Sequence, residues 1–359
     1  MRGWLGAENK MFSYVRPEQR IPRDHPLRAI RELTEAVLRE LSHSLGKLYS
    51  REGRPSIPPE QLISALLLQV LYGIRSERRL MEELDYNLLY RWFVGLAADD
   101  PVWDTTVFTK NRERLERGDI FQKFMTKLLE HEKVRPLLSD EHFSVDGTLI
   151  EAWASHKSFK PRNDKDGDGT DFHGQKRKND THQSTTDPEA KLYRKASGRE
   201  AKLSFMGHVV MENRNGLAVA GCVTEANGTA ERRASEKLMK ALAKRKRRRL
   251  TVGEDKAYDA RDHVNELRRI NVTPHVAQND GETKTGRRRK SAIDARTTGH
   301  IGYRMSQSRR AMIECIFGWG KQHGTMRKTK HRGTVRVDSD FLLNLIGYNL
   351  VRIPKLIPV

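Results

Sequence analysis

The sequence of 359 residues contains only two cysteines, Cys222 and Cys315, which excludes a disulfide-stapled secreted scaffold and a four-thiolate zinc site. It also lacks a long apolar run. The best one, Leu62 to Ile74, is interrupted by polar residues and is shorter than the ~18 apolar residues that a membrane span needs. The N-terminus shows no basic-then-apolar signal pattern. We therefore expect a cytosolic protein rather than a secreted or membrane-bound one.

Acidic residues are scarce in the second part of the chain. Residues 1–140 carry 23 Lys and Arg against 21 Asp and Glu, a net charge of +2, whereas residues 141–359 carry 44 against 26, a net charge of +18. A positive excess confined to one segment predicts a polyanionic partner. The basic runs lack the bulky apolar face of a membrane-surface helix, so we expect nucleic acid.

Much of this excess lies in short basic clusters, although any single run is equally consistent with a solvated face. Two of them are candidate DNA-binding segments, namely Lys244, Arg245, Lys246, Arg247, Arg248 and Arg249, and Arg287, Arg288, Arg289 and Lys290. A third runs from Arg327 to Arg332.

Residues 1–140 are predicted to form an all-helical N-terminal domain that binds DNA ends, mediates dimerisation, or does both. Pro58 and Pro59 favour a helix start, and helical spacing of apolar residues follows to Ile74. Further helices are expected over 78–95, over 105–117 with Asp104 as the N-cap, and over 121–132. Such short helices are consistent with a helix-turn-helix or with a bundle used only for packing.

Residues 141–359 are predicted to form a mixed α/β domain. Strands are expected at 143–146, at 205–211 and 217–224 joined by an Asn-Gly hairpin, at 250–253 and at 272–277. Helices are expected over 230–246, 259–269 and 306–318. A polar segment near 157–200 is too hydrophilic to be buried and reads as an insertion.

Three acids in this domain are candidates for one metal site. Asp146 and Asp255 are predicted at strand ends, and Glu314 lies on the last of the predicted helices. Grouped carboxylates need cations between them, and oxygen-only ligands suit Mg²⁺ or Mn²⁺. Two such ions can activate water and stabilise a leaving oxygen at a phosphodiester.

The predicted helix around Glu314 gives a second signal. Arg310, Glu314 and Lys321 share one face at ~100° per residue if the helix persists, so a carboxylate would be flanked by two cations that can contact phosphates. The structural alternative is a surface ion pair between Arg310 and Glu314. Glu151 and Glu254 are possible decoys for the site acids, and Trp153 and Trp319 are candidates for base stacking or, more simply, for packing.

Together these segments resemble bacterial insertion-sequence DDE transposases, specifically the insertion-sequence-five group. The matching motifs are Val145-Asp146-Gly147-Thr148-Leu149-Ile150-Glu151-Ala152, Gly253-Glu254-Asp255-Lys256-Ala257-Tyr258-Asp259, and Arg310-x3-Glu314-x6-Lys321. The family's third motif also carries a Tyr three residues before its Arg, where this chain has Gln307.

The resemblance implies a ribonuclease-H-like catalytic domain in which Asp146, Asp255 and Glu314 hold two Mg²⁺ ions, with Mn²⁺ as a substitute, and in which Arg310 and Lys321 contact DNA. It implies a transposase that binds terminal inverted repeats, cleaves the element ends and joins the 3′ ends to target DNA, as a homodimer or higher oligomer. Two alternatives remain at this point: a non-catalytic DNA-binding regulator or inactive element remnant, and a structure-specific nuclease on the same fold.

Overall fold

The computed structural model describes residues 16–50, 52–53, 56–162, 177–194, 198, 200–246, 248–282, 286 and 288–357. Two of the candidate DNA-binding residues, Arg247 and Arg287, lie outside these ranges. None of the helices in the described ranges combines the length and apolarity needed to cross a membrane.

The N-terminal part is helical, as the sequence predicts. It comprises α1 (Pro17–Arg20), α2 (Leu27–Gly46), α3 (Pro59–Leu71), α4 (Glu77–Tyr86), α5 (Leu88–Val94), α6 (Thr105–Arg117) and α7 (Ile120–Glu130). The Asp104 carboxylate accepts the Thr106 N–H and caps α6 as expected. The helix predicted over 78–95 is divided at Asn87, because its side-chain oxygen accepts the N–H groups of Leu89 and Tyr90 and begins α5.

The second part of the chain is built on a mixed sheet with the strand order β6-β5-β1-β7-β8, and β4 (Lys191–Tyr193) pairs with the start of β5. The five main strands are β1 (His142–Glu151), β5 (Lys202–Glu212), β6 (Ala218–Glu225), β7 (Leu250–Glu254) and β8 (Val272–Val276). β1, β5 and β6 are antiparallel, whereas β7 and β8 run parallel to β1. This is the ribonuclease-H-like arrangement, preceded by the helical region.

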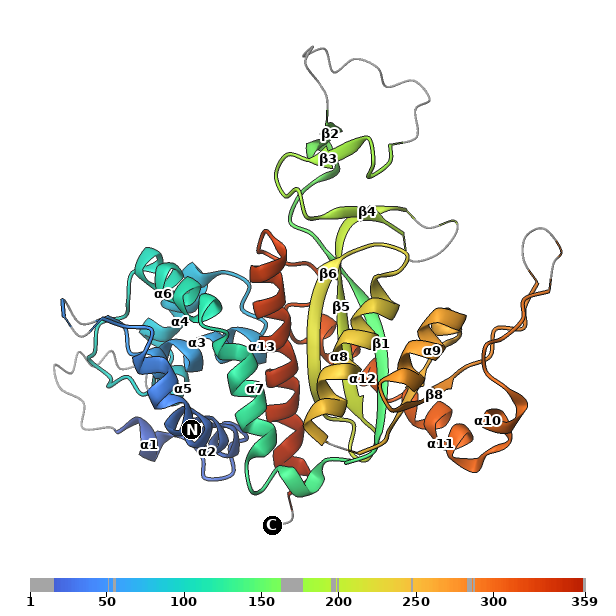
Figure 1. Ribbon diagram of the computed structural model, residues 1–359. Coiled ribbons are helices and arrows are strands. Elements are labelled where there is room, and N and C mark those ends of the chain that lie inside the picture. The colour runs from blue at the N-terminus through green and yellow to red at the C-terminus, as the bar shows by residue number, and fades with distance from the viewer. Residues whose placement is uncertain are drawn as a thin grey trace, which may run out of the picture.

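Helices cover both faces of the sheet (Figure 1). One face packs on α8 (Ala230–Lys246) and α9 (Arg261–Arg269), around a core that includes Val145, Val252 and Met239. The opposite face is covered by α11 (Ile301–Arg310), α12 (Ile313–Gln322) and α13 (Thr334–Arg352), and α10 (Ala295–Gly299) precedes α11. Alternation along β1 therefore places even-numbered residues such as Ser144 and Thr148 on the α11–α12 face.

The segment predicted as a polar insertion carries little regular structure in its described parts. A short hairpin pairs β2 (Phe159–Pro161) with β3 (His182–Ser184), apart from the main sheet.

Single 3-10 turns lie elsewhere along the chain, at Arg135–Leu137, His156–Ser158, Lys256–Tyr258 and Ile353–Lys355.

The long C-terminal helix α13 joins the two parts of the chain and was not anticipated from the sequence. It packs on β6 along one side and on α3 and α7 along the other. A single hydrophobic cluster consequently includes residues of the helical region, of α12 and α13, and of β5 and β6.

Candidate active site

Asp146 lies in the middle of β1, opposite Val209 of β5, and not at a strand end as predicted from the sequence. On the other side of β1, however, the pairing with β7 stops at Ser144 and Gly253. The two parallel strands separate beyond that pair. Asp146 is the first residue of β1 after the separation whose side chain lies on the same face of the sheet as Ser144. The sequence prediction was wrong because pairing with the antiparallel strand β5 continues β1 to Glu151, five residues beyond Asp146.

Asp255 follows the last residue of β7. Asp146 and Asp255 are each two residues past the Ser144–Gly253 pair on parallel strands, so they lie level with each other on the same side of the sheet. The Asp255 carboxylate accepts the Ala257 N–H at 2.8 Å and thereby caps the 3-10 turn at Lys256–Tyr258. This cap fixes the position of the carboxyl group at the mouth of the gap between β1 and β7.

The third motif lies on two helices rather than on the single helix predicted over 306–318. Hydrogen bonds from the N–H groups of Met312 and Cys315 to the carbonyls of Arg309 and Met312 tighten the backbone and separate α11 from α12. Arg310 ends α11, and Glu314 lies in the first turn of α12. Within the described residues no ion pair joins them, which removes the structural alternative of a helical salt bridge.

Helix α12 continues through Gly318 and Gly320 and places Lys321 directly on β1. The Lys321 ammonium donates to the Thr148 hydroxyl, on the same face of β1 as Asp146 and two residues farther along. Arg310 is half-buried, and its Nε has no hydrogen-bond partner among the described residues. Lys321 of the third motif therefore lies beside β1, and the Arg310 guanidinium keeps an unused donor in its Nε.

Burial, together with the negative charges of Asp255, Glu314 and Glu231, raises the pKa of Asp146 to about 7. The opposing effect comes from one hydrogen bond, which the Gly147 N–H donates at 2.7 Å. The charges of the other three carboxyl groups therefore reach Asp146. A buried carboxyl with so little compensation is the kind of group that marks a functional site.

Glu231 was missed by the sequence reasoning. It lies in the first turn of α8, and a Cβ placed on Gly147 would come within 2.8 Å of its Oε1, so the missing side chain of Gly147 makes room for it. Acidic residues are common in first helical turns because they complement the helix dipole, and nothing in the sequence separates Glu231 from that use.

The acids fit a hard divalent cation in their chemistry. Asp146, Asp255 and Glu314 offer only oxygen ligands, which suit Mg²⁺ and Mn²⁺, and their mutual repulsion is uncompensated. In the conformation described, no three His, Cys, Asp or Glu side chains of the described residues are grouped closely enough to hold a metal ion. The three carboxylates must therefore approach one another to share a cation.

Glu254 and Glu151, the acids that could be mistaken for site residues, both have structural partners. Glu254 is fully buried on the opposite side of β7, where its carboxylate accepts from Ser235 and lies 2.8 Å from His263 Nε2. Glu151 forms ion pairs with Lys202 at 3.1 Å and Lys328 at 3.2 Å.

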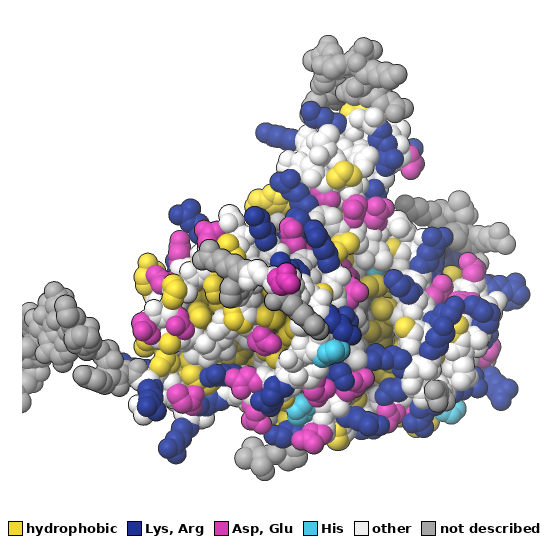
Figure 2. Space-filling model, turned by 60° about the vertical axis from the view of Figure 1, so that its left-hand side comes forward, with side chains coloured by type: hydrophobic (Ala, Val, Ile, Leu, Met, Phe, Trp, Pro, Cys, Tyr) yellow, Lys and Arg dark blue, Asp and Glu magenta, His cyan; other side chains and the backbone are white. Residues whose placement is uncertain are grey.

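The basic cluster after α8 is partly engaged in ion pairs with the connection between α7 and β1. Arg245 pairs with Glu130, Lys246 with Asp140 and Arg248 with Glu141. Arg249 donates to the Thr273 hydroxyl, whereas Lys244 is exposed. Arg288, Arg289 and Lys290 are exposed as well. Lys and Arg side chains are spread over the face of the molecule shown in Figure 2.

Comparison with known proteins gives two kinds of match, while no curated protein sequence matches the chain. Among solved structures, the piggyBac transposase synaptic complex with hairpin DNA is 11% identical, covering 91% of this chain and 74% of that one at a TM-score of 0.41. A Mos1 transposase paired-end complex with the left transposon end is 12% identical, covering 86% and 81% at a TM-score of 0.21.

The family matches span most of the chain. Residues 15–114 match the family described as a transposase domain (DUF772), and residues 138–350 match the transposase DDE domain. The second match covers more than half of the sequence and contains all three motifs. The chain belongs to the DDE transposase family, and it is a transposase.

Proposed function

We propose that this transposase binds the terminal inverted repeats of its own element, cleaves the DNA at the element ends and joins the freed 3′ ends to target DNA. The observation that supports this is that Asp146 and Asp255 lie level at the gap where β7 leaves β1, and that the charge of Glu314 contributes to the raised pKa of Asp146. Two acids that are far apart in the sequence lie side by side at this gap, and the charge of Asp146 is stabilised by only one hydrogen bond. Such an arrangement is typical of a functional site rather than of a structural one.

In this proposal Asp146, Asp255 and Glu314 hold two Mg²⁺ ions, which Mn²⁺ can replace. Bound there, the ions supply Lewis-acid activation of the attacking oxygen and stabilise the leaving oxygen. Lys321, positioned by the Thr148 hydroxyl, and Arg310 bind phosphate oxygens on the same side of β1. Their charge orients the scissile phosphate toward the acids.

Double-stranded DNA is the partner in this proposal, with element ends and target brought together by a homodimer or higher oligomer in the nucleoid region of the cytoplasm. The exposed Lys244, Arg288, Arg289 and Lys290 provide sequence-independent phosphate contacts. Such contacts release counterions, so affinity for DNA should fall steeply as the salt concentration rises. The helical residues up to about 140 are proposed as a separate end-binding or dimerisation domain.

The decisive experiment substitutes Asp146→Asn and measures Mg²⁺-dependent cleavage and joining of labelled element ends. The substitution keeps the shape of the side chain and removes the charge that a divalent cation requires, so we expect cleavage to be abolished and end binding to be retained. Glu151→Gln, on the same strand but engaged with two lysines, is the matched control and should keep its activity.

Other outcomes of the same assay would point elsewhere. Cleavage that survives in Asp146→Asn contradicts the metal assignment. End binding without divalent-dependent cleavage in the unsubstituted protein indicates a regulator or inactive remnant. Cleavage without joining indicates a nuclease.

A further inference from the structure

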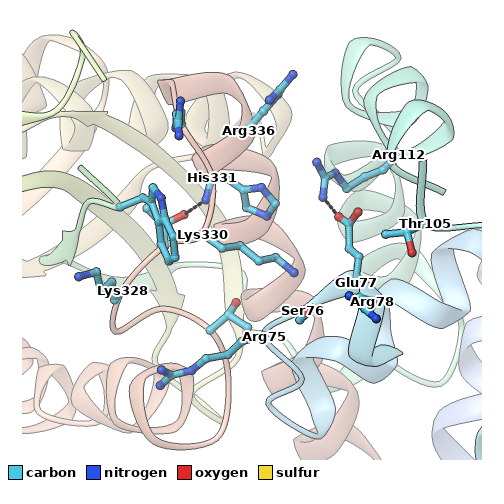
Figure 3. Close-up of a pocket in the computed structure, with 14 residues that line it drawn as sticks. Arg75, Ser76, Glu77, Arg78, Thr105, Arg112, Lys328, Lys330, His331 and Arg336 are labelled. Atoms are coloured by element: carbon cyan, nitrogen blue, oxygen red, sulfur yellow. Dashed lines mark hydrogen bonds and ion pairs between the residues drawn. The ribbon is translucent and has the colours of Figure 1, made fainter. Parts of the chain in front are cut away.

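A strongly basic cleft lies between the helical region and the segment that links α12 to α13. It has a volume of about 760 Å³. One wall comes from the start of α4 and from α6, the other from residues 325–336. Figure 3 shows Arg112 and Glu77 on the first wall facing Lys330 and His331 on the second. None of these residues belongs to the acid site.

The basic side chains that line the cleft outnumber the acidic side chains that line it. Seven Lys and Arg side chains line it, against the single acid Glu77, which is bound to Arg112. Arg75 and Arg332 are exposed and have no ion-pair partner among the described residues. The side chain of Lys328 is also exposed, with Glu151 as its acidic neighbour. Cations that are not neutralised by the protein favour an anionic ligand.

Two titratable groups of the cleft are largely buried, with the buried Asp340 3.9 Å from His331 Nε2. Burial lowers the pKa of Lys330 to about 8, and its ammonium donates to the side-chain oxygen of Gln69 at 3.0 Å. Burial, followed by the charges of Arg112, Lys330 and Arg336, also lowers the pKa of His331 far below its ordinary value. An anion placed in the cleft would relieve both effects.

An exposed indole completes the lining. Trp153 lies just past the end of β1 and is 54% exposed. Such exposure is unusual for tryptophan, which has the largest apolar side chain, and aromatic residues make up only 7% of this sequence. An aromatic ring beside several cations is the combination that binds single-stranded nucleic acid, because bases stack on the ring while the cations hold the phosphates.

β1 connects this cleft to the acid site. Trp153 lies seven positions after Asp146, a separation of at most ~23 Å at ~3.3 Å per residue of strand. Stacked nucleotides advance by ~3.4 Å, so a DNA strand followed along β1 covers about seven nucleotides between the two positions, and fewer if it is stretched. The phosphate-binding Lys321 and then Lys328 lie along this path.

We propose that this cleft is a second nucleic-acid site, which takes unpaired nucleotides of the DNA strand within about seven nucleotides of the reacting phosphate. Trp153 stacks on a base, and Arg75, Lys328 and Arg332 contact phosphates. Sites of ~300–1,000 Å³ enclose small ligands, so the volume suits one or two nucleotides rather than a duplex. The inference rests on the proposed function, because the transposase reaction supplies the DNA strand.

The test measures binding of a fluorescently labelled oligonucleotide of ten thymidines, with a duplex of equal length for comparison. Stacking on one aromatic ring corresponds to an affinity change of about 5- to 100-fold, so Trp153→Ala should weaken single-strand binding by that factor. Trp153→Phe should restore most of it. Tyr86→Ala, at an aromatic residue that is 81% exposed but outside the cleft, is the control and should bind normally.

The phosphate contacts have a separate signature. The double variant Arg75→Ala/Arg332→Ala should reduce the slope of log affinity against log salt by ~1.4, since each single-strand phosphate contact contributes ~0.7. Single-strand binding that does not respond to Trp153→Ala would overturn the proposal, and so would a Trp153→Ala variant that loses duplex binding by the same factor as single-strand binding.

Failure here is distinguishable from failure of the proposed function. If Asp146→Asn abolishes cleavage while Trp153→Ala binds normally, only the cleft assignment is lost. If the oligonucleotide results are as expected but the unsubstituted protein cleaves no element ends, the proposed transposition reaction is contradicted and the cleft assignment stands.

Discussion

Glu212 and Asp146 are carboxyl groups on neighbouring strands with opposite surroundings. Glu212 is fully buried at the end of β5, where its carboxylate accepts four backbone N–H groups, those of Ser139, Arg214, Asn215 and Leu217, at 2.8 to 3.0 Å. Asp146 accepts one, from Gly147. The first carboxylate is satisfied by the fold, and the second keeps a single hydrogen bond. This contrast separates a structural acid from a candidate catalytic one.

We expect Glu212→Gln to destabilise the protein by roughly 2–3 kcal/mol, because the amide replaces an acceptor with a donor that faces N–H groups. Denaturant unfolding at neutral pH measures the change. Glu225→Gln, at an exposed position on β6, provides the comparison and should be nearly neutral. An unchanged midpoint in Glu212→Gln would show that its four hydrogen bonds contribute little.

Sequence reasoning proposed the three acids and Lys321 through their motifs, and the structure places Asp146, Asp255 and Lys321 on one side of the sheet. It did not identify Glu231 or the role of Thr148. Both depend on which side chains lie next to β1 once α8 and α12 are docked, and no spacing along the chain encodes that contact.

At the scale of the element, α13 is docked onto β6 by buried polar side chains. The Asn349 amide bonds both the N–H and the carbonyl of Ala218, at 3.0 and 2.8 Å. The Asp338 carboxylate accepts the Val223 N–H at 2.6 Å. The helix thus supplies hydrogen bonds that a further strand would otherwise make.

Asp338 makes this docking sensitive to pH. Burial raises the pKa of Asp338 from 3.8 to about 6. A raised pKa means that the folded state binds the proton more tightly, so this contribution is complete below about pH 4 and is lost as the pH rises through about 6. Asp338→Asn keeps an oxygen for Val223 and removes the charge.

We therefore expect Asp338→Asn to increase the free energy of unfolding at pH 7.5 by on the order of 2–3 kcal/mol and to leave it unchanged near pH 4. Urea unfolding at the two pH values tests this, with Asp99→Asn at an exposed position as the control. A variant that is less stable than the original at pH 7.5 would contradict it.

The elements that the sequence predicts well are those with local signals. The Asn-Gly turn and its two strands, the Asp104 cap, and helix α8 depend on nearby residues and agree with the structure. α13 could not be found in this way because it is buried on almost every side, so no polar face marks its helical period. The break between α11 and α12 likewise has no Gly or Pro to announce it.

At the scale of the whole molecule, the helical region and the sheet share one hydrophobic core through α13. Gly347 permits the closest contact, because a Cβ at this position would lie 2.9 Å from Val70 of α3 and 3.1 Å from Trp319 of α12. Core sharing of this kind couples the stability of the two parts even though the sequence changes character near residue 140.

We expect a single cooperative unfolding transition, with circular dichroism and tryptophan fluorescence changing together. Gly347→Val should lower the midpoint of both signals equally, by an amount corresponding to about 1–3 kcal/mol, because overpacking separates α13 from α3 and α12. Gly299→Ala, where the added methyl group meets open space, is the control. Two separate transitions would show that the parts unfold independently.

The docking of α13 also has a consequence for how the protein behaves in concentrated solution. An outermost strand with free backbone groups is a template for strand addition between molecules, and it promotes aggregation. Asn349 and Asp338 occupy those groups on β6 at Ala218 and Val223, near both ends of the strand. Removing both side chains would therefore leave the β6 edge of the sheet free to pair with another molecule. We expect the resulting protein to aggregate and to be recovered in the insoluble fraction.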